Sequence, residues 1–540
     1  MKLQDLLADL PTASLTGDPE IKVTGLAFDS REVEPGMLFV AYAGKAVDGH
    51  DYIPQAVERG AAAVVGEQPR PAGLPGEVAY VQAPDGREAL ALLAAAWHGR
   101  PSHKMTVVGV TGTDGKTTTV NLLQSILSAA GLKIGMVSTV NALIGDHYQD
   151  TGLHVTTPDA LQIQGLLARM AEAGTQVAIL ETTSHGLAQH RVTGTAYDVA
   201  VVTNVTREHL DEHGTWEQYL DAKARLFQML SSSAHKPGVP KAAVINADDA
   251  SYPRLAPIPA DLQLAYGLDS PADVTAEDVV ITAEGVSFTV RAPQARFPIR
   301  SPLVERYNLY NILAAVSAAL ALEVPVAAIQ AGVAALHGVT GRMERIEEGQ
   351  DFSAIVDFAH TPAALEAALR ALRPQTEGRL IAVYGCAGLR DVYKRAAMGR
   401  VSGELADVTV ITAEDPRTED LDAIIDQIAQ GCEAAGAREG EQYDRVPDRG
   451  AAGAGEGTTY YRVPDRGAAL AFACKLAQPG DIVVAAGKGH EQSMCFGTVE
   501  YPWDDRVAMR AALLDVLGRP GEVEAPALPT TDDGRQTTDD

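Results

Sequence analysis

Residues 105–119 read MTVVGVTGTDGKTTT, and the rest of the chain is organised around this stretch. An apolar β-branched run comes first, glycines spaced by threes follow, and Lys116 then opens a helix-forming segment. This order indicates a phosphate-binding loop, because glycines let backbone N–H groups surround a phosphate and the helix N-terminus adds partial positive charge. The usual loop has a further glycine where this chain has Val110, so the pattern is a GxxGxxGKT variant. The predicted ATP contacts in the loop are Gly112, Thr113, Asp114, Gly115, Lys116, Thr117 and Thr118.

The composition narrows the class of protein. A chain of 540 residues with 46% hydrophobic and 21% charged residues suggests about three or four domains of a soluble protein. A net charge of −27 argues against nucleic-acid and anionic-membrane partners. The four cysteines lack metal-ligand spacing, and no apolar run reaches the length of a membrane span. We therefore expect a reduced, cytoplasmic protein. We also expect it to be a monomer.

Short apolar strands alternate with helix-forming stretches along most of the chain. The pattern predicts a small α/β domain over 1–100, a parallel-sheet domain with the phosphate loop over 101–338 and a second parallel-sheet domain over 339–518. The remaining residues, 519–540, are rich in Pro, Thr and Asp and are expected to be disordered.

Polar side chains follow the strands of the 101–338 region. Glu181 comes directly after the run 177–180, and His209 comes a few residues after the run 199–202. The carboxyl ends of parallel strands meet at one edge of a sheet, and the phosphate loop lies at the same edge. Glu181 and His209 are therefore candidate ligands for a metal ion beside the ATP phosphates, and Thr117 is placed to offer its hydroxyl to Mg²⁺.

A local duplication interrupts the third region. The octapeptide RVPDRGAA occurs at 445–452 and again at 462–469, with a glycine-rich tract between the copies. A single duplication does not make a repeat fold, which needs several stacked units. We interpret it as a flexible surface insertion.

Taken in order, several motifs resemble those of the Mur ligases, and among them the enzymes that add the third amino acid of the peptidoglycan precursor peptide. The resemblance extends from Asp29 to Arg510. It implies a three-domain α/β architecture: a small N-terminal domain that binds the UDP-sugar, a central P-loop ATPase domain and a C-terminal Rossmann-like domain that binds the amino acid. The motifs are TGTDGKTT, TTP (156–158), SHGLAQHR (184–191), HLDEHG (209–214), YLDAKARLF (219–227), GRMER (341–345), DFAHTP (357–362) and AGKGHE (486–491).

The resemblance implies ATP-driven amide bond formation. The D-glutamate γ-carboxylate of UDP-MurNAc-L-Ala-D-Glu would be phosphorylated to an acyl phosphate, which the amine of a diamino acid would attack, with ADP and phosphate as products. It further implies two Mg²⁺ ions and a carbamate, derived from CO₂, on Lys223. By sequence alone Lys223 would be read as a solvated helix lysine. The implied catalytic residues are Lys116, Glu181, His209 and Lys223, and the implied metal ligands are Thr117, Glu181, His209 and carbamylated Lys223.

Substrate contacts are implied residue by residue. Asp357, His360 and Lys394 are expected to act once the domains close around the acyl phosphate. The UDP-sugar-peptide contacts are Phe28, Ser30, Lys45, Ala46, Thr156, Thr157, Thr183, Gln189 and Arg191. The further ATP contacts are Asn308, Asn311 and Arg342. The amino-acid contacts are Arg390, Asp415, Arg417, Gly487 and Glu491.

The segment 414–417, EDPR, bears on which amino acid is added. In the family, the sequence DNPR is typical of enzymes that use meso-diaminopimelate. The arginine of this motif binds the far carboxylate of that substrate. Here Asp415 replaces the asparagine and Glu414 precedes it. The added negative charge favours L-lysine or L-ornithine over meso-diaminopimelate, with Arg417 turned to pair with Asp415 or Glu414. Other departures from the family pattern are Val155, Thr183, Glu305 and Leu389.

Two alternatives stay open. A folylpolyglutamate synthetase-like ligase shares the phosphate loop and the two larger domains, but it lacks the N-terminal nucleotide-sugar domain. A non-catalytic nucleotide-dependent binding protein is an alternative of another class, and the retention of Lys116, Glu181 and Lys223 argues against it.

Overall fold

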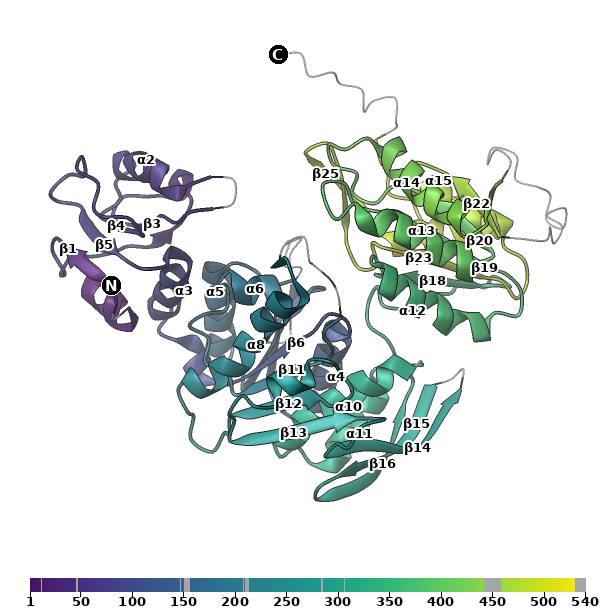
Figure 1. Ribbon diagram of the computed structural model, residues 1–540, viewed down its shortest axis with the longest axis horizontal. Helices are drawn as coiled ribbons and strands as arrows, with labels where there is room; N and C mark the ends of the chain where they lie inside the picture. Colours follow the sequence, from purple (N-terminus) through teal and green to yellow (C-terminus); the bar gives the residue numbers. More distant parts are fainter. Residues whose placement is uncertain are drawn as a thin grey trace, which may run out of the picture. The chain divides into compact units, whose positions relative to one another are not determined.

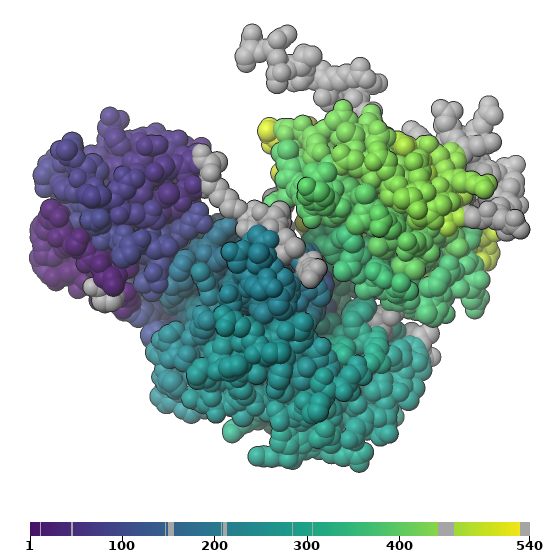
Figure 2. Space-filling model, in the orientation of Figure 1, coloured from purple at the N-terminus to yellow at the C-terminus, as the bar shows by residue number. Residues whose placement is uncertain are grey.

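The structure is a computed structural model that describes the whole chain apart from Pro11, 45–46, Asp146, 150–155, Arg207, 209–212, 283–284, Glu305, 441–457 and 530–540. It divides into two compact units, Met1–Leu336 and His337–Asp540. The first runs from purple to teal and the second from green to yellow (Figures 1 and 2). Several expectations fall outside the described residues: the roles of Lys45, Ala46 and His209, the departures at Val155 and Glu305, the first copy of the duplication and the end of the tail.

The first unit begins with a five-stranded sheet in the order β1-β5-β4-β3-β2. Strands β2 to β5 are parallel, and β1 pairs antiparallel with β5. Apolar residues of the strands and of α3 form its core, and Asp85 caps α3 by accepting two backbone N–H bonds. The elements are α1 Leu3–Leu6, β1 Ser14–Thr16, β2 Leu26–Ala27, β3 Leu38–Val40, α2 Ile53–Glu58, β4 Ala63–Gly66, β5 Ala79–Gln82 and α3 Gly86–Trp97.

An eleven-stranded sheet follows, in the order β16-β15-β14-β13-β12-β11-β6-β10-β7-β8-β9. Strand β6 lies between β10 and β11, parallel to both. Helices α4, α10 and α11 pack together against one apolar cluster, and α8 contributes to the other (Figure 1). The strands are β6 Thr106–Thr111, β7 Ile134–Val137, β8 Ala142–Ile144, β9 His147–Gln149, β10 Val177–Glu181, β11 Val199–Val202, β12 Ala242–Asn246, β13 Leu262–Gly267, β14 Val274–Thr282, β15 Gly285–Ala292 and β16 Ala295–Ser301. The helices are α4 Lys116–Ala129, α5 Ala160–Glu172, α6 Ser184–Ala188, α8 Trp216–Ser232, α9 Tyr252–Leu255, α10 Arg306–Ala321 and α11 Val326–Ala335.

The second unit holds a seven-stranded sheet in the order β17-β18-β23-β19-β20-β22-β21, parallel except for β17. Helices α15 and α16 contribute to one apolar cluster, and α12 and α14 to the other. The strands are β17 Glu344–Ile346, β18 Ser353–Asp357, β19 Leu380–Tyr384, β20 Val408–Ile411, β21 Arg438–Glu439, β22 Thr459–Arg462, β23 Ile482–Ala486, β24 Ser493–Phe496 and β25 Val499–Pro502. The helices are α12 Pro362–Leu372, α13 Tyr393–Leu405, α14 Leu421–Ala434, α15 Arg466–Leu476 and α16 Asp505–Val516. Short 3₁₀ helices lie at Leu7–Asp9, Ser30–Glu32, Gly49–Tyr52, Pro101–Lys104 and Arg373–Gln375.

These sheets confirm the predicted α/β class. One expectation is corrected: the second copy of the duplication is not part of a surface insertion. Arg462 ends β22, and Arg466 opens α15 with a fully buried side chain that pairs with Asp505 at 2.7 Å. A buried guanidinium needs such a partner, so this copy belongs to the core. Residues up to 529 are described, and Leu528 packs against the α15–α16 cluster.

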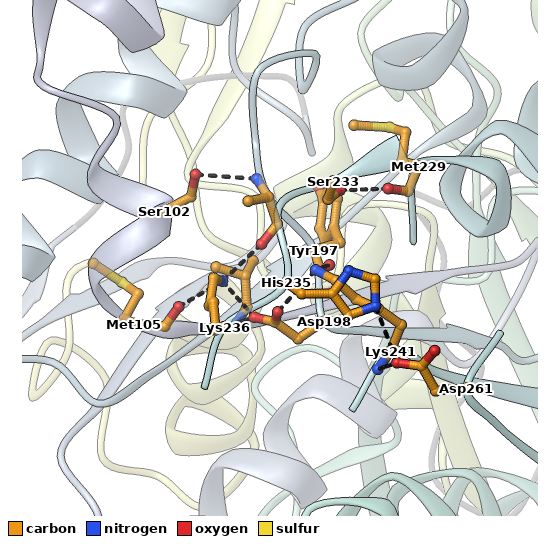
Figure 3. A network of polar contacts seen from close by, with 12 residues as sticks. Ser102, Met105, Tyr197, Asp198, Met229, Ser233, His235, Lys236, Lys241 and Asp261 are labelled. Carbon is orange, nitrogen blue, oxygen red and sulfur yellow. Dashed lines mark hydrogen bonds and ion pairs between the residues drawn. The ribbon is translucent and has the colours of Figure 1, made fainter. Parts of the chain in front are cut away.

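A buried ionic network holds the amino ends of β6, β11 and β12 together (Figure 3). The fully buried Asp198 accepts a hydrogen bond from the backbone of Val107 at 2.8 Å and from Lys241 Nζ at 3.0 Å, and it also pairs with Lys236. Both lysines donate to backbone carbonyls as well. One carboxylate therefore links three segments at the edge of the sheet opposite the phosphate loop.

None of the described helices is long and apolar enough to cross a membrane. Cys386, Cys432, Cys474 and Cys495 are all buried free thiols.

Candidate active site

The phosphate loop joins β6 to α4, as predicted. Gly112 and Gly115 have φ values of +149° and +80°, which residues with a Cβ rarely adopt. A Cβ at Gly112 would lie 1.8 Å from Thr203 Oγ1, and one at Gly115 would lie 2.1 Å from Asn311 Oδ1. Both glycines are therefore required by the backbone conformation and by the surrounding side chains.

The loop is braced by the segment after β11. The backbone N–H groups of Thr113 and Asp114 donate to the carbonyl and side-chain oxygens of Asn204, at 2.8 and 3.0 Å. Lys116 Nζ donates to the Thr113 carbonyl at 2.7 Å, so its ammonium lies over the loop. Thr118 lies half-buried in the first turn of α4. The seven predicted loop residues are thus contiguous at a helix N-terminus that suits an anionic phosphate.

Thr117 and Glu181 meet beside the loop. Thr117 Oγ1 lies 3.1 Å from both carboxylate oxygens of Glu181, which ends β10 and is buried. The backbone N–H of Thr139 donates to Glu181 Oε2 at 3.0 Å. Thr139 was not predicted from the sequence, although the polar stretch STVN (138–141) follows β7 just as Glu181 follows an apolar run. A hydroxyl and a carboxylate are hard oxygen donors that fit Mg²⁺.

The described residues contain no cluster of three His, Cys, Asp or Glu side chains that could hold a metal ion. His209 lies outside the described residues, and Lys223 would be a ligand as its carbamate. The oxygen pair of Thr117 and Glu181 is therefore the part of the expected metal site that the structure describes.

Lys223 is buried, contrary to the ordinary fate of a helix lysine. Its side chain on α8 is 1% exposed, Nζ donates to the Gly112 carbonyl at 2.6 Å, and the ammonium lies 4.4 Å from the ring centroid of Tyr219. Burial and the nearby Lys116 hold the pKa of Lys223 well below its usual value. Tyr219 in turn contacts Thr113 through its hydroxyl at 3.1 Å. The lysine therefore lies directly under the phosphate loop, with an increased neutral fraction.

The residues predicted around the muramoyl peptide form one hydrogen-bonded group. Thr157 Oγ1 lies 3.0 Å from Thr183 Oγ1 and donates to the Glu181 carbonyl at 3.1 Å. Arg191 donates to the Thr157 carbonyl at 2.7 Å and to Gln189 Oε1 at 2.8 Å. Thr156 accepts a hydrogen bond from the Thr139 hydroxyl at 3.1 Å. This group therefore adjoins the Thr117–Glu181 pair.

Two of the residues predicted for the nucleotide sugar, Phe28 and Ser30, lie directly after strand β2 of the N-terminal sheet. Phe28 stacks against Tyr42 with ring centroids 6.4 Å apart, and the buried Ser30 donates to Gln55 Oε1 at 2.7 Å. Arg87 lies 5.2 Å from the centroid of Tyr42. Tyr42 and Arg87 were not predicted from the sequence. An aromatic pair beside a guanidinium can stack on a planar base.

Asn308 and Asn311 lie on one face of α10. Asn311 Nδ2 donates to Asn308 Oδ1 at 3.0 Å, and the Asn311 oxygen faces Gly115. In the second unit, Arg342 stacks over the ring of Phe358 at 4.5 Å. Asn311 therefore reaches the phosphate loop, Asn308 supports it by this hydrogen bond, and Arg342 contacts a residue of the second unit.

In the second unit, Lys488 forms ion pairs with two of the residues that were predicted to contact the amino acid. The ammonium is 1% exposed and pairs with Asp415 at 2.9 Å and Glu491 at 2.6 Å. Burial alone would lower the pKa of Lys488, but Glu491 and Asp415 outweigh it and raise the pKa. Gly487 precedes it at φ +108°.

The expected partner of Arg417 is corrected. Arg417 was expected to pair with Asp415 or Glu414, but Asp415 accepts from Lys488 and from the Cys495 backbone, and Arg417 Nη1 donates weakly to the Gly388 carbonyl at 3.4 Å. The physical reason is that the more deeply buried Lys488 requires a counter-charge, which Asp415 supplies. Arg390 is exposed, as is the neighbouring Leu389.

The DFAHTP segment lies after β18. Asp357 accepts backbone N–H groups of Met343 and Ala359 at 2.7 and 2.8 Å, and burial raises its pKa. Lys394 Nζ donates to the His360 carbonyl at 2.9 Å. These groups share one edge of the second sheet with Asp415 and Lys488, because all of them follow carboxyl ends of parallel strands.

Comparisons with known proteins agree with this arrangement. Residues 22–98 match the Mur ligase family catalytic domain, 110–319 the Mur ligase middle domain and 341–489 the Mur ligase glutamate ligase domain. A UDP-N-acetylmuramyl-tripeptide synthetase of Roseiflexus sp. (strain RS-1) is 46% identical over 96% of this chain and 99% of its own length. A UDP-N-acetylmuramoyl-L-alanyl-D-glutamate–2,6-diaminopimelate ligase of Gloeobacter violaceus is 42% identical over 95% of this chain and 98% of its own.

Solved structures give the same result. One described as UDP-N-acetylmuramoyl-L-alanyl-D-glutamate–2,6-diaminopimelate ligase is 31% identical with a TM-score of 0.64, covering 96% of this chain and 99% of that one. A Mycobacterium tuberculosis folylpolyglutamate synthase complexed with ADP shares the fold at 16% identity and a TM-score of 0.55, covering 73% of this chain and 91% of that one. The chain therefore belongs to the Mur ligase family, as an ATP-dependent amide ligase that adds an amino acid to a UDP-MurNAc-dipeptide in peptidoglycan precursor synthesis.

Proposed function

We propose that the chain couples ATP hydrolysis to attachment of a diamino acid to the D-glutamate γ-carboxylate of UDP-MurNAc-L-Ala-D-Glu. The observation that supports this most directly is the continuity of contacts through Glu181. Its carboxylate meets Thr117 of the phosphate loop, and its backbone carbonyl accepts a hydrogen bond from Thr157 of the group predicted to hold the muramoyl peptide. A phosphate donor and a carboxylate acceptor bound to these residues would be neighbours.

The chemistry requires charge neutralisation rather than a protein nucleophile. Transfer of the γ-phosphoryl group to a carboxylate brings two anions together, and Lys116, the α4 N-terminus and bound Mg²⁺ would neutralise that charge. Arg191, a bidentate donor, suits a carboxylate of the peptide. Attack of an amine on the acyl phosphate then forms the amide and releases phosphate. Thr117 and Glu181 are the described residues that would hold the metal.

We propose that Lys223 carries a carbamate. Its neutral amine would attack CO₂, forming an N–C bond and releasing a proton, and the product is an anion where the free lysine is a cation. The burial of Lys223 and its lowered pKa favour the neutral amine that this step needs. The carbamate oxygens would serve, with His209, as further ligands for Mg²⁺.

Two amino-acid classes are candidates for the addition, each favoured by one observation. Asp415 at the position of the family's asparagine favours L-lysine or L-ornithine, whose far end is a lone ammonium. Arg417 favours meso-diaminopimelate, because among the described residues its guanidinium makes one long hydrogen bond, of 3.4 Å to the Gly388 carbonyl, and it could pair with the far carboxylate of that substrate. Relatives named 2,6-diaminopimelate ligases support the second candidate.

Phosphate release from ATP tests the function. We expect release to require both UDP-MurNAc-L-Ala-D-Glu and a diamino acid, with a product heavier by one residue in mass spectrometry. A chain that used a folate and glutamate instead would be a folylpolyglutamate synthetase-like ligase. If the chain bound ATP but released no phosphate with any combination of substrates, it would be a non-catalytic binding protein and the proposal would be wrong.

A further inference from the structure

A pocket of about 480 Å³ lies at the amino edge of the eleven-stranded sheet, opposite the phosphate loop. It is lined by the 3₁₀ helix Pro101–Lys104 and the start of β6, by the turn between α5 and β10, and by the segment between α8 and β12. Because β6 leads from this pocket to the phosphate loop, its six residues place the two about 20 Å apart. A volume in this range suits a small-molecule ligand.

The ionisable side chains that line the pocket are all basic. They are His103, Lys104 and Lys236, and none of the described lining residues is acidic. His103 and Lys104 lie at the surface, and within the described residues neither side chain forms a hydrogen bond or an ion pair. The chain as a whole has a net charge of −27, so this pocket is a local exception that favours an anion.

Lys236 contributes a positive charge that its ion pair does not cancel. Asp198 pairs with both Lys236 and Lys241, so two ammonium groups share one carboxylate (Figure 3). The side chains of Asp198 and Lys241 are 0% and 1% exposed, whereas Lys236 is 10% exposed and lines the pocket. Burial is the main reason that the pKa of Lys236 is lowered, and Lys241 adds to this shift while Asp198 opposes it. An anion in the pocket would stabilise the charged form of Lys236.

The polar groups of the turn after α5 are compatible with an anion. The carbonyls at the end of a helix carry partial negative charge, but those of 169–171 already accept the backbone N–H groups of 173–175. Gln176 lines the pocket, and its side-chain oxygen accepts the backbone N–H of Lys133 at 2.9 Å. The NH₂ group of Gln176 is therefore the end of the amide that could donate to a ligand.

His103 is placed to respond to an anion. Partial burial of the ring lowers its pKa, and the cations Lys236, Arg100 and Lys241 lower it further. Asp9, which pairs with Arg100 at 2.7 Å, opposes the shift, and the adjacent Lys104 is a further cation. The ring is therefore mainly neutral near pH 7, and a bound anion would favour its protonated form.

We propose that this pocket binds a small phosphate-bearing anion, with Lys104, Lys236 and His103 as its cationic contacts. A phosphate group carries about two negative charges near pH 7 and presents several acceptor oxygens to the donors around it. The ligand is either free inorganic phosphate or a small phosphate ester, since the volume leaves room beyond one phosphate group. This second anion site lies at the opposite end of β6 from the phosphate loop, and it does not depend on the proposed ligase reaction.

Calorimetric titration of the full-length protein tests the proposal. The phosphate loop is first filled with Mg²⁺ and a non-hydrolysable ATP analogue, and the ionic strength is held constant with chloride. The probes are sulfate, inorganic phosphate and glucose 6-phosphate. We expect each to bind at millimolar concentration or below, and the tighter of the two phosphate probes distinguishes free phosphate from a phosphate ester. If none of the three bound, the proposal would be wrong.

Two variants locate the bound anion. Replacement of both His103→Gln and Lys104→Gln removes two contacts, and we expect the affinity for sulfate and phosphate to fall by about ten- to a hundredfold. Both side chains lie at the surface, so the variant should keep the melting temperature of the wild type. Lys475→Gln removes a charge from an exposed pair with Asp515 in the second unit and should leave the affinity unchanged. Equal affinities in the double variant and the wild type would place the anion elsewhere and overturn the proposal.

The titration of His103 gives an independent readout. Its Cε1–H signal in the NMR spectrum is identified by its loss in His103→Gln. Sulfate keeps the same charge through the pH range in which histidine titrates, so it serves as the probe here. The midpoint of the His103 titration should move to higher pH when sulfate is added, because the anion stabilises the protonated ring. An unchanged midpoint at saturating sulfate would contradict the assignment of this pocket.

Discussion

Replacement of Asp198 by asparagine should destabilise the first unit by about 3 kcal/mol. The change leaves Lys241, 1% exposed, and Lys236, 10% exposed, without their counter-charge. Breaking a buried ion pair by removing one partner typically costs about 3–5 kcal/mol. The lower figure applies because both lysines keep carbonyl acceptors, at 2.6 Å for Lys241 to Tyr197 and at 2.7 and 2.8 Å for Lys236 to Met105 and Ala196.

Differential scanning calorimetry measures this effect. At roughly 2 °C per kcal/mol for a unit of this size, Asp198→Asn should lower the melting temperature of the first unit by about 6 °C. The control is Asp221→Asn, which breaks the exposed pair with Arg254 and should cost at most about 1 kcal/mol. Equal shifts in the two variants would show that the network in Figure 3 does not carry the stability assigned to it.

Four further outcomes are expected. Gly115→Ala should abolish ATP binding by equilibrium dialysis, because its Cβ would meet Asn311 Oδ1 at 2.1 Å; unchanged affinity would contradict the loop geometry. Lys223→Ala should keep its circular dichroism spectrum, lose nearly all ligase activity and regain part of it with added acetate or bicarbonate; an unmodified amine in native mass spectra of fully active wild type would refute the carbamate. Asp415→Asn should raise the specificity constant for meso-diaminopimelate relative to L-lysine by about ten- to a hundredfold, since a charge-assisted bond is worth about 1.5–3 kcal/mol; no change would remove Asp415 from specificity. Truncation after Pro529 should leave the melting temperature unchanged, whereas loss of Leu528 as well should lower it measurably, because that side chain packs on the second unit's core.

The phosphate loop and the parallel sheets could be predicted because their signals are local. Strand length, glycine spacing and the start of α4 all lie within one short stretch. The antiparallel strands β14 to β16 were not predicted. Val279, Val280 and Ile281 are consecutive exposed apolar residues, and the irregular pairing between Glu277 and Val280 breaks the alternation that indicates a strand.

Side-chain partners were harder to predict than their positions. Lys488 and Asp415 are 73 residues apart, and no local pattern indicates that one will neutralise the other. The burial of Lys223 depends on the loop carbonyl of Gly112 and the ring of Tyr219, which only the folded domain places around it. The position of polar residues after predicted strands indicated which side chains lie at the carboxyl edge of each sheet. Which of these side chains pair with one another depends on how deeply each is buried, and the sequence does not show that.

The burial of all four cysteines makes the natural chain a ready background for spectroscopy. Thiol-directed dyes should react slowly with the folded protein, since Cys386, Cys432, Cys474 and Cys495 are enclosed. Cysteines introduced at the exposed positions Gln228 and Ala367, one in each unit, would then take a donor and an acceptor fluorophore. Energy transfer between them would report, molecule by molecule, whether the separation of the two units changes when nucleotide and muramoyl substrate bind.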